Sequence, residues 1–205
     1  MRRKTEEKRQ AIVDAAFEVF SESGFEQASM SDIAARVGGS KATLYSYFES
    51  KEEMFFEVMI ESAASEVKAA FDLLKISVPV RDTLTSFGKH YLIAILQPQL
   101  LAIRRLANHE GGRSHIGVLF HERGPKIGWQ MVADYLDQAS EAGQLRRCNS
   151  AAATAHLRAL YEAELLELAL LGVPVDTSPR NIAKVIQRAV DVFTTAYGPE
   201  KPALA

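Results

Sequence analysis

The side chains of this sequence that are best suited to recognise another molecule lie close together, between residues 41 and 47. Proteins read base edges in the major groove of DNA through hydrogen-bond donors and acceptors, and through apolar contacts with thymine methyl groups. A lysine, a threonine, a serine and two tyrosines provide all of these groups in this short segment. The segment therefore predicts sequence-specific DNA contact. The residues that we expect to face the DNA are Lys41, Ala42, Thr43, Tyr45, Ser46 and Tyr47.

Further residues are expected to contact the phosphates of the DNA backbone. Lys51 begins a helix, where its ammonium group and the free backbone N–H groups together attract an anion. Ser29 and Ser40 carry hydroxyl groups at helix starts, but helix capping explains each of them equally well, and Ser29 has capping-box spacing to Asp32. The basic residues 2–4 either form an arm that contacts DNA or are a solvated terminus.

Two short helices joined by a glycine turn must position these side chains. The glycine pair 38–39 allows a tight turn, because glycine adopts positive φ angles at little cost. The second helix, expected over residues 41–48, has Leu44 and Phe48 four residues apart, which gives it one buried face. This arrangement is a helix-turn-helix, the unit that places its second helix in the major groove.

Residues 10–56 resemble the DNA-binding domain of the TetR/AcrR family of bacterial transcription regulators. The features that carry the resemblance are Gly24-Phe25, Asp32-Ile33-Ala34, Gly38, Thr43-Leu44-Tyr45, Tyr47-Phe48 and Lys51-Glu52. An ordered run of this length is far more specific than a helix-turn-helix pattern alone. The remainder, including FHERGPKIGWQMVADYLDQASEAGQL, is similar to the divergent ligand-binding and dimerisation domains of that family.

The composition limits the class of protein and the source of any DNA affinity. Hydrophobic residues make up 47% of the chain and charged residues 24%, as is usual for soluble globular proteins. The formal net charge of −2 argues against a protein that coats nucleic acid indiscriminately. The single cysteine, Cys148, suits a reducing cytoplasm, and the sequence has no apolar run long enough for a membrane span. We therefore expect a cytoplasmic protein without a membrane partner.

Apolar residues recur with helical spacing along nearly the whole chain, which predicts an all-α fold. We expect about nine helices, divided between a three-helix DNA-binding domain in residues 1–50 and a helical bundle for ligand binding and dimerisation in residues 51–205. The expected helices cover residues 5–23, 32–37, 41–48, 51–75, 80–96, 99–109, 119–142, 150–171 and 178–197.

The last two expected helices indicate a second buried surface. Helix 178–197 carries an apolar stripe of period i, i+3, i+4, i+7, and helix 150–171 is apolar over an arc wider than one core face requires. The family resemblance implies that these helices form a four-helix bundle between two copies of the chain; the alternative is that they complete the core of a monomer. The residues assigned to this homodimer interface are Leu165, Leu168, Ala189 and Phe193.

The resemblance also implies a small organic effector, which would bind an apolar cavity with a few polar anchors. The candidate residues are His90, Tyr91, Arg104, Asn108, His109, Trp129, Tyr161 and Glu164. Each has an ordinary structural alternative: Trp129 as a core residue, for example, and the pair 104–105 as a solvated helix face or a salt-bridge partner of Glu164. The mixture of aromatic, arginine and histidine side chains suits a flat aromatic or weakly anionic molecule.

Other classes of function are disfavoured. His109, His115 and His121 recur every six residues, which places them on different helix faces, so we expect no metal site and no cofactor. The sequence has no nucleophile elbow, Walker loop or dinucleotide fingerprint, so we expect no enzyme activity. Cys148 follows the basic pair 146–147, which leaves a redox-sensing role open, as is a protein-interaction module with a relic DNA domain.

These observations together predict a homodimeric repressor that binds double-stranded DNA at a palindromic operator. The effector is expected to bind in the helical body and to shift the long helix 51–75, which leads from Lys51 into that body. Two recognition helices must keep a fixed separation to enter successive major grooves, so a shift of this helix would release the operator.

Overall fold

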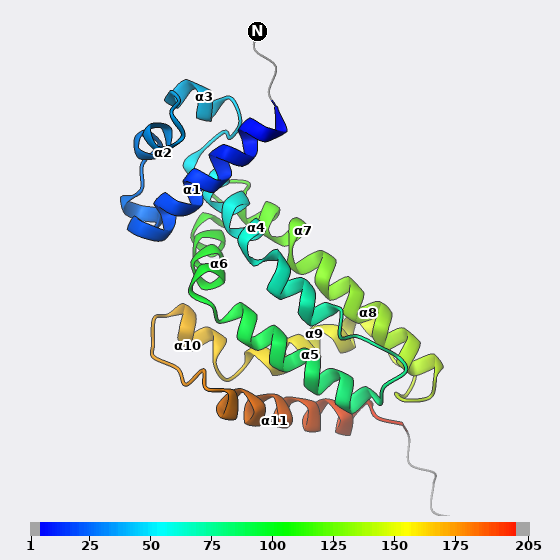
Figure 1. The fold of residues 1–205 in the computed structure, drawn as a ribbon. Helices are drawn as coiled ribbons and strands as arrows, with labels where there is room; N and C mark the ends of the chain where they lie inside the picture. The colour runs from blue at the N-terminus through cyan, green and yellow to red at the C-terminus, as the bar shows by residue number, and fades with distance from the viewer. Residues whose placement is uncertain (1–4, 200–205) are drawn as a thin grey trace, which may run out of the picture. The chain divides into compact units, whose positions relative to one another are not determined.

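The structure, a computed structural model, describes residues 5–199, except for the side chains of residues 59–66. Every regular element in this part of the chain is an α-helix, which confirms the predicted all-α fold. The helices are α1 (Glu6–Gln27), α2 (Met30–Val37), α3 (Lys41–Tyr45), α4 (Lys51–Phe71), α5 (Val80–Ile95), α6 (Pro98–Glu110), α7 (Ile116–Arg123), α8 (Pro125–Glu141), α9 (Ser150–Glu162), α10 (Leu166–Leu170) and α11 (Pro179–Tyr197) (Figure 1).

The eleven helices of the described residues exceed the expected nine because two expected helices are divided. The expected helix 119–142 is broken at Gly124, and α8 begins at Pro125. Proline suits the first turn of a helix but cannot donate the backbone hydrogen bond that would continue the preceding one. The expected helix 150–171 is interrupted at residues 163–165, where no glycine or proline marks the break.

The described residues form two compact units. The first contains the residues up to Ala63 together with Ala102–Phe120, and the second contains Ala64–Leu101 and the residues from His121 onward. The helix α4 therefore begins in the first unit and ends in the second.

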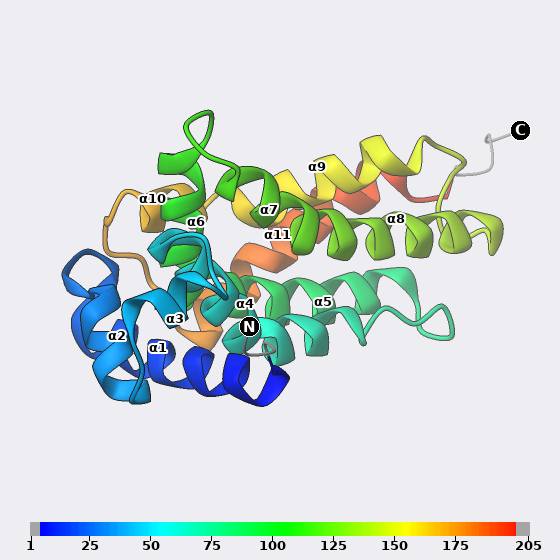
Figure 2. The same cartoon turned by 90° about the horizontal axis from the view of Figure 1, so that it is seen from above.

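The first unit contains the helix-turn-helix. Within it α2 packs against α1 and α3 packs against α2 (Figures 1 and 2). The α1 helix bends at Gly24, whose φ angle of 74° is in the left-handed region that glycine tolerates. Near this bend, the ring of Phe55 from α4 packs against two rings of α1. Its centroid lies 4.9 Å from that of Phe20 and 5.0 Å from that of Phe25. This aromatic cluster fixes the first turns of α4 against α1.

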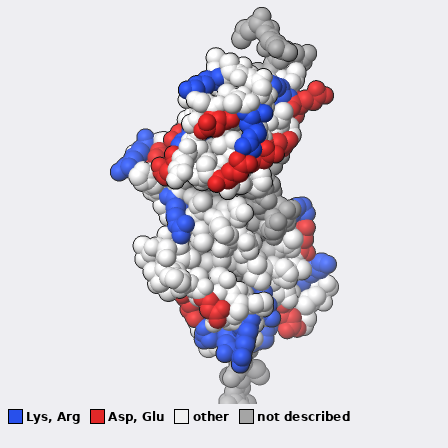
Figure 3. Space-filling model, turned by 60° about the vertical axis from the view of Figure 1, so that its left-hand side comes forward, with Lys and Arg blue, Asp and Glu red and all other residues white. Residues whose placement is uncertain are grey.

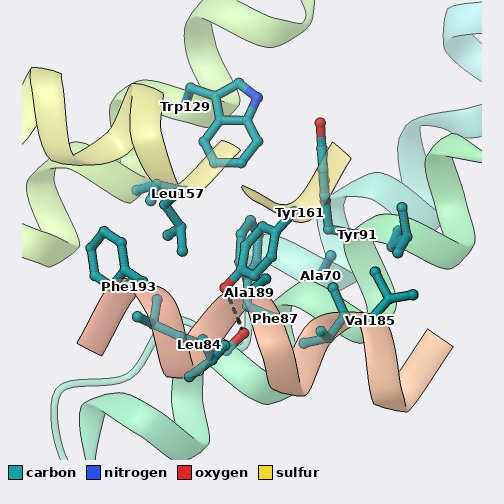
Figure 4. Close-up of a cluster of buried hydrophobic side chains, with 14 of the residues drawn as sticks. Ala70, Leu84, Phe87, Tyr91, Trp129, Leu157, Tyr161, Val185, Ala189 and Phe193 are labelled. Atoms are coloured by element: carbon teal, nitrogen blue, oxygen red, sulfur yellow. Dashed lines mark hydrogen bonds between the residues drawn. The ribbon is translucent and has the colours of Figure 1, made fainter. Parts of the chain in front are cut away.

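The core of the second unit is built by α5, α8, α9 and α11. The α11 helix packs against α5 and α9, and α9 packs against α8. Figure 4 shows the large side chains that fill this core, and the hydroxyl of Tyr161 donates a hydrogen bond to the carbonyl oxygen of Leu84 at 2.7 Å. Gly88 makes room for that ring, because a Cβ at this position would lie 2.8 Å from Tyr161 Cε1.

Candidate functional site

The helix-turn-helix is held by side-chain caps at both of its helix starts. The backbone N–H of Asp32 donates to Ser29 Oγ at 3.2 Å, and the backbone N–H of Ser29 donates to the Asp32 carboxylate at 3.2 Å. This reciprocal pair confirms the predicted capping box. Gly38 ends α2 with a φ angle of 66°, and Ser40 Oγ accepts the backbone N–H of Thr43 at 3.1 Å to begin α3. The turn and both helix starts are thus specified locally.

The α3 helix has one buried face and one exposed face. Leu44 is fully buried and Phe48, just beyond the helix, is 2% exposed. Tyr45 is 52% exposed, and Lys41 is exposed as well. The helix ends at Tyr45, earlier than the expected residue 48, and its last turn is closed by Ser46, whose hydroxyl donates to the Thr43 carbonyl at 2.7 Å. The side chains at 41, 42, 45 and 46 therefore face solvent.

Of the four hydroxyl groups at residues 41–47 that are expected to contact DNA, three already have partners within the unit, that of Ser46 among them. Thr43 Oγ1 lies 3.0 Å from Ser40 Oγ, and either atom can donate. The hydroxyl of Tyr47 accepts a hydrogen bond from the backbone N–H of Thr5 at 3.2 Å. Tyr47 therefore joins the segment after α3 to the start of α1. Tyr45, in contrast, extends its ring from the exposed face.

Lys51 lies in a different setting from the one expected for a phosphate ligand. Its ammonium group donates to the carbonyl oxygens of Phe25 at 2.8 Å and Ala28 at 3.2 Å, and it lies 4.2 Å from the centroid of the Phe25 ring. These carbonyls belong to the last turn and end of α1, where a helix carries partial negative charge. A phosphate contact would require the ammonium group to leave both carbonyls. The basic residues 2–4 lie outside the described residues.

Charges of both signs cover the first unit. Arg36, at the end of α2, donates to Glu22 at 2.7 Å and to Glu18 at 3.0 Å. The hydrogen bonds to Glu22 and Glu18 raise the pKa of Arg36 and hold the guanidinium against α1. In the face shown in Figure 3, acidic and basic side chains are interspersed over this unit. Any DNA affinity of this unit therefore depends on where single charges lie.

The aromatic effector candidates lie in the core of the second unit. The Tyr91 ring lies 5.0 Å from the Trp129 ring and packs against the Phe87 ring at 5.7 Å (Figure 4). Tyr161 is fully buried, and this burial raises the pKa of its hydroxyl well above the ordinary value. The hydroxyl of Tyr91 donates to the carboxylate of Glu162. These rings are thus part of the core of the second unit.

The remaining effector candidates are spread over both units. His90 is exposed on α5, while Arg104, Asn108 and His109 lie on α6 in the residues of the first unit. Glu164 does not pair with the arginines at 104 and 105: its carboxylate accepts from Arg188 Nε at 2.9 Å, and this contact lowers its pKa.

The structure revises the expected dimer interface. Leu165, Ala189 and Phe193 are 7%, 4% and 0% exposed within a single protomer, so they complete the core of the second unit. Leu168 is 43% exposed. The wide apolar arc of these helices is thus largely used against α5 and α8 of the same chain. The sequence cannot separate these two uses of an apolar residue.

The second unit has a surface hollow that the sequence did not predict. A hollow of about 340 Å³ lies along α8 and α9, and its wall includes Trp129, Thr154, Arg158 and Glu162. Of these four residues only Trp129 is a predicted candidate. The signal that could have found the others is their four-residue spacing on α9, which places them in one row.

Three further properties concern the part of the chain that the structure describes. None of its helices combines the length and the apolar character that crossing a membrane requires. Within the same residues, no three His, Cys, Asp or Glu side chains lie close enough together to hold a metal ion. Cys148 is half-buried in the segment before α9.

Comparison with known proteins gives two matching family models. Residues 12–58 match a model described as bacterial regulatory proteins of the tetR family. Residues 82–199 match a model described as the C-terminal domain of AefR-like transcriptional repressors.

Solved structures are similar over nearly the whole chain. A protein described as a TetR-family transcriptional regulator from Mesorhizobium loti MAFF303099 has a TM-score of 0.81 at 22% identity, covering 95% of this chain and 100% of that one. The flavonoid-responsive regulator FrrA has a TM-score of 0.76 at 30% identity, covering 96% of this chain and 100% of that one.

Curated relatives match over shorter stretches. The fatty acid metabolism regulator protein of Bacillus subtilis (strain 168) is 27% identical over 96 residues, which are 46% of this chain and 50% of that protein. The transcriptional activator FasR of Mycolicibacterium smegmatis is 38% identical over 68 residues, which are 32% of this chain and 31% of that protein. The match thus spans half or less of the length of these relatives.

Proposed function

Because this chain belongs to the tetR family of bacterial transcription regulators, we propose that it is a repressor that a small organic effector releases from a palindromic operator. The members of this family bind DNA to regulate transcription, and they are not enzymes. The division of labour that we propose assigns DNA reading to residues 1–50 and effector binding and dimerisation to residues 51–205. We place the protein in the cytoplasm, where bacterial DNA lies.

The proposal rests on the exposed face of α3. Lys41 and Tyr45 extend from a helix whose opposite face, at Leu44, is fully buried and whose start is capped by Ser40. A lysine donates to guanine or to phosphate, and a tyrosine hydroxyl can donate or accept at a base or a phosphate. Ala42, Thr43, Ser46 and Tyr47 complete the proposed surface, with Ser29 and Ser40 at its edges. Lys51, whose ammonium group is bound to carbonyl oxygens at the end of α1, is assigned to holding α4 in place. A rigid short helix with an exposed polar face can enter a major groove.

A palindromic operator requires two copies of this unit. We place the dimer interface on the exposed apolar side chains of the last helices, of which Leu168 is 43%, Leu171 71% and Val192 55% exposed. Exposed large apolar side chains can form part of a protein interface. A two-fold interface formed by the same surface of each copy gives the symmetry that an inverted repeat matches.

The effector is proposed to act in the second unit. The α4 helix carries Lys51 at its first residue and Phe71 at its last, and the Phe71 ring packs against Gly128 of α8. A ligand that moves α8 would therefore act directly on the end of α4. A coupling of about 1–3 kcal/mol would weaken operator binding by about 5- to 150-fold. The aromatic residues around Trp129 and the similarity to a flavonoid-responsive regulator support a flat aromatic effector.

The experiment that tests this function uses the full-length protein and an operator found by selection on genomic DNA. We expect two protomers per inverted repeat and a dissociation constant of about 10⁻⁸ M. Affinity should fall steeply with salt, because each phosphate contact releases counterions. A reporter gene behind that operator should be repressed by the protein. Binding of one protomer per site, or increased expression of the reporter, would contradict the proposal.

A further inference from the structure

The hollow on the second unit has the dimensions of a small-molecule site. Its volume of about 340 Å³ is at the lower end of the ~300–1,000 Å³ that such sites occupy. Ala151, Ala155 and Ala159 line it from α9. Residues four apart lie next to each other on a helix, so these three short side chains leave a continuous apolar space along α9.

A second row of α9 gives this hollow a polar wall. Arg158 Nε donates to Glu162 Oε1 at 3.1 Å, and the guanidinium carbon of Arg158 lies 5.6 Å from the centroid of the Trp129 ring. The terminal nitrogens of Arg158 have no hydrogen-bond partner among the described residues. The Glu162 carboxylate and the indole therefore fix the guanidinium while its outer donors remain available.

The third residue of this row carries a buried polar atom. Thr154 is 6% exposed, it lines the hollow, and its hydroxyl oxygen is buried without a hydrogen-bond partner in the part of the chain that the structure describes. A buried hydroxyl group without a partner is unfavourable, and such groups in native proteins are rare. Its position four residues before Arg158 places both donors on the same side of the hollow.

We propose that this hollow binds a planar aromatic carboxylate. The carboxylate would accept hydrogen bonds from the terminal nitrogens of Arg158 and from the hydroxyl of Thr154, and the ring would lie against the alanine row and the edge of the Trp129 indole. Arginine is suited to this role because its planar guanidinium matches carboxylate geometry. Glu162 holds the guanidinium in place, and its negative charge disfavours a second anionic group on the ligand. We identify this carboxylate with the effector of the regulator, and only this identification rests on the proposed function; its binding to the hollow does not.

Binding is tested with three probes on the full-length protein. Trp129 is the only tryptophan of the chain, so its fluorescence reports events at the hollow. The probes are cinnamate, cinnamamide, which lacks the charge, and cyclohexanecarboxylate, which lacks the aromatic ring. We expect saturable quenching by cinnamate, with an affinity at least about tenfold higher than for either control. Absence of cinnamate binding, or equal binding of cyclohexanecarboxylate, would overturn the proposal.

Variants locate the binding site. Ala155→Leu fills the hollow and should abolish cinnamate binding in calorimetry, whereas Ala152→Leu, at an exposed position outside the hollow, should leave it unchanged. Arg158→Met keeps the apolar stem and should weaken cinnamate binding by about tenfold, with a smaller effect on cinnamamide. If Ala155→Leu does not fold, Arg158→Met alone tests whether cinnamate binds in the hollow. Unchanged cinnamate affinity in Arg158→Met would overturn the proposal.

An operator-release assay separates this site from the proposed function. If cinnamate releases the operator from the wild-type protein but not from Ala155→Leu, the hollow is the effector site. If it releases both proteins equally, the hollow is not that site, although the protein is still a regulator. If the wild-type protein selects no DNA sequence, the proposed function fails while cinnamate binding can still be measured.

Discussion

The ammonium group of Lys51 lies 2.8 Å from the carbonyl oxygen of Phe25 and 4.2 Å from the centroid of the Phe25 ring. One side chain thus joins the first residue of α4 to the last turn of α1. It also donates to Ala28, whose carbonyl directly precedes the cap of α2. Lys51 therefore holds together the elements that orient α3, which is a role different from a direct phosphate contact.

This relationship predicts a stability effect of Lys51→Met. Two hydrogen bonds from a partly buried ammonium group are lost, so the free energy of unfolding should fall by about 1–3 kcal/mol in urea titrations. The dependence of operator affinity on salt should stay as in the wild type. Lys41→Met is the matched control, because Lys41 is exposed on α3. It should leave stability unchanged and reduce the salt slope by about one per protomer. The opposite pattern would make Lys51 the phosphate ligand.

A close approach of two residues predicts a strong steric effect in the second unit. A Cβ at Gly128 would lie 2.5 Å from Cζ of Phe71, so Gly128→Ala must displace this ring. Crowding should cost about 1–3 kcal/mol, which the better helix propensity of alanine offsets by up to about 1 kcal/mol. In a Phe71→Leu background the same substitution should cost clearly less. Additive effects in this double-mutant cycle would contradict the packing that the structure shows.

The buried hydroxyl of Tyr161 predicts an alkaline dependence of stability. Burial raises its pKa in the folded state, whereas in the unfolded chain it ionises near the ordinary value of about 10. The unfolded state therefore loses its proton first, and stability falls as the pH rises above about 10. Tyr161→Phe should lose about 0.5–1.5 kcal/mol at pH 7 and show a smaller decrease at higher pH. Urea titrations of both proteins at pH 7 and above pH 10 measure both effects. If the free energy of unfolding of the two proteins fell equally between these pH values, the prediction would be contradicted.

The exposed apolar residues of the last helices predict the effect of a charge in the dimer interface. Val192 is 55% exposed within the protomer, so Val192→Arg should fold normally but separate the dimer, because it buries an unpaired charge in the interface. Light scattering should show a monomer with unchanged helical content by circular dichroism. Val78→Arg, in the segment before α5, is the control and should remain dimeric. A Val192→Arg dimer would place the interface elsewhere.

The sequence predicts the helix-turn-helix well because its determinants are local. The structure confirms three of these determinants: the capping pair Ser29 and Asp32, the positive φ angle of Gly38 and the burial of Leu44. Each depends on residues close together in the chain. The end of α3 at Tyr45, short of the expected residue 48, shows that apolar spacing alone does not fix a helix end.

The remaining features depend on contacts between residues far apart in the chain. The break at residues 163–165 has no glycine or proline signal, and the burial of Phe193 against its own protomer depends on where α5 and α9 pack. The partners of Lys51 and Glu164 likewise depend on tertiary structure, because a lysine or glutamate on a helix reveals its charge but not its neighbour. Sequence patterns therefore predict which residues form helices more reliably than which atoms of different helices meet.

Binding-site selection from random DNA tests the central claim most directly. The wild-type protein should enrich one inverted repeat, because α3 presents the same exposed residues from each copy of a dimer. Tyr45→Ala removes a side chain that is 52% exposed, so it should fold normally and lose base preference at defined positions of each half-site. No enriched sequence with the wild-type protein, or an identical sequence and affinity with Tyr45→Ala, would contradict the account.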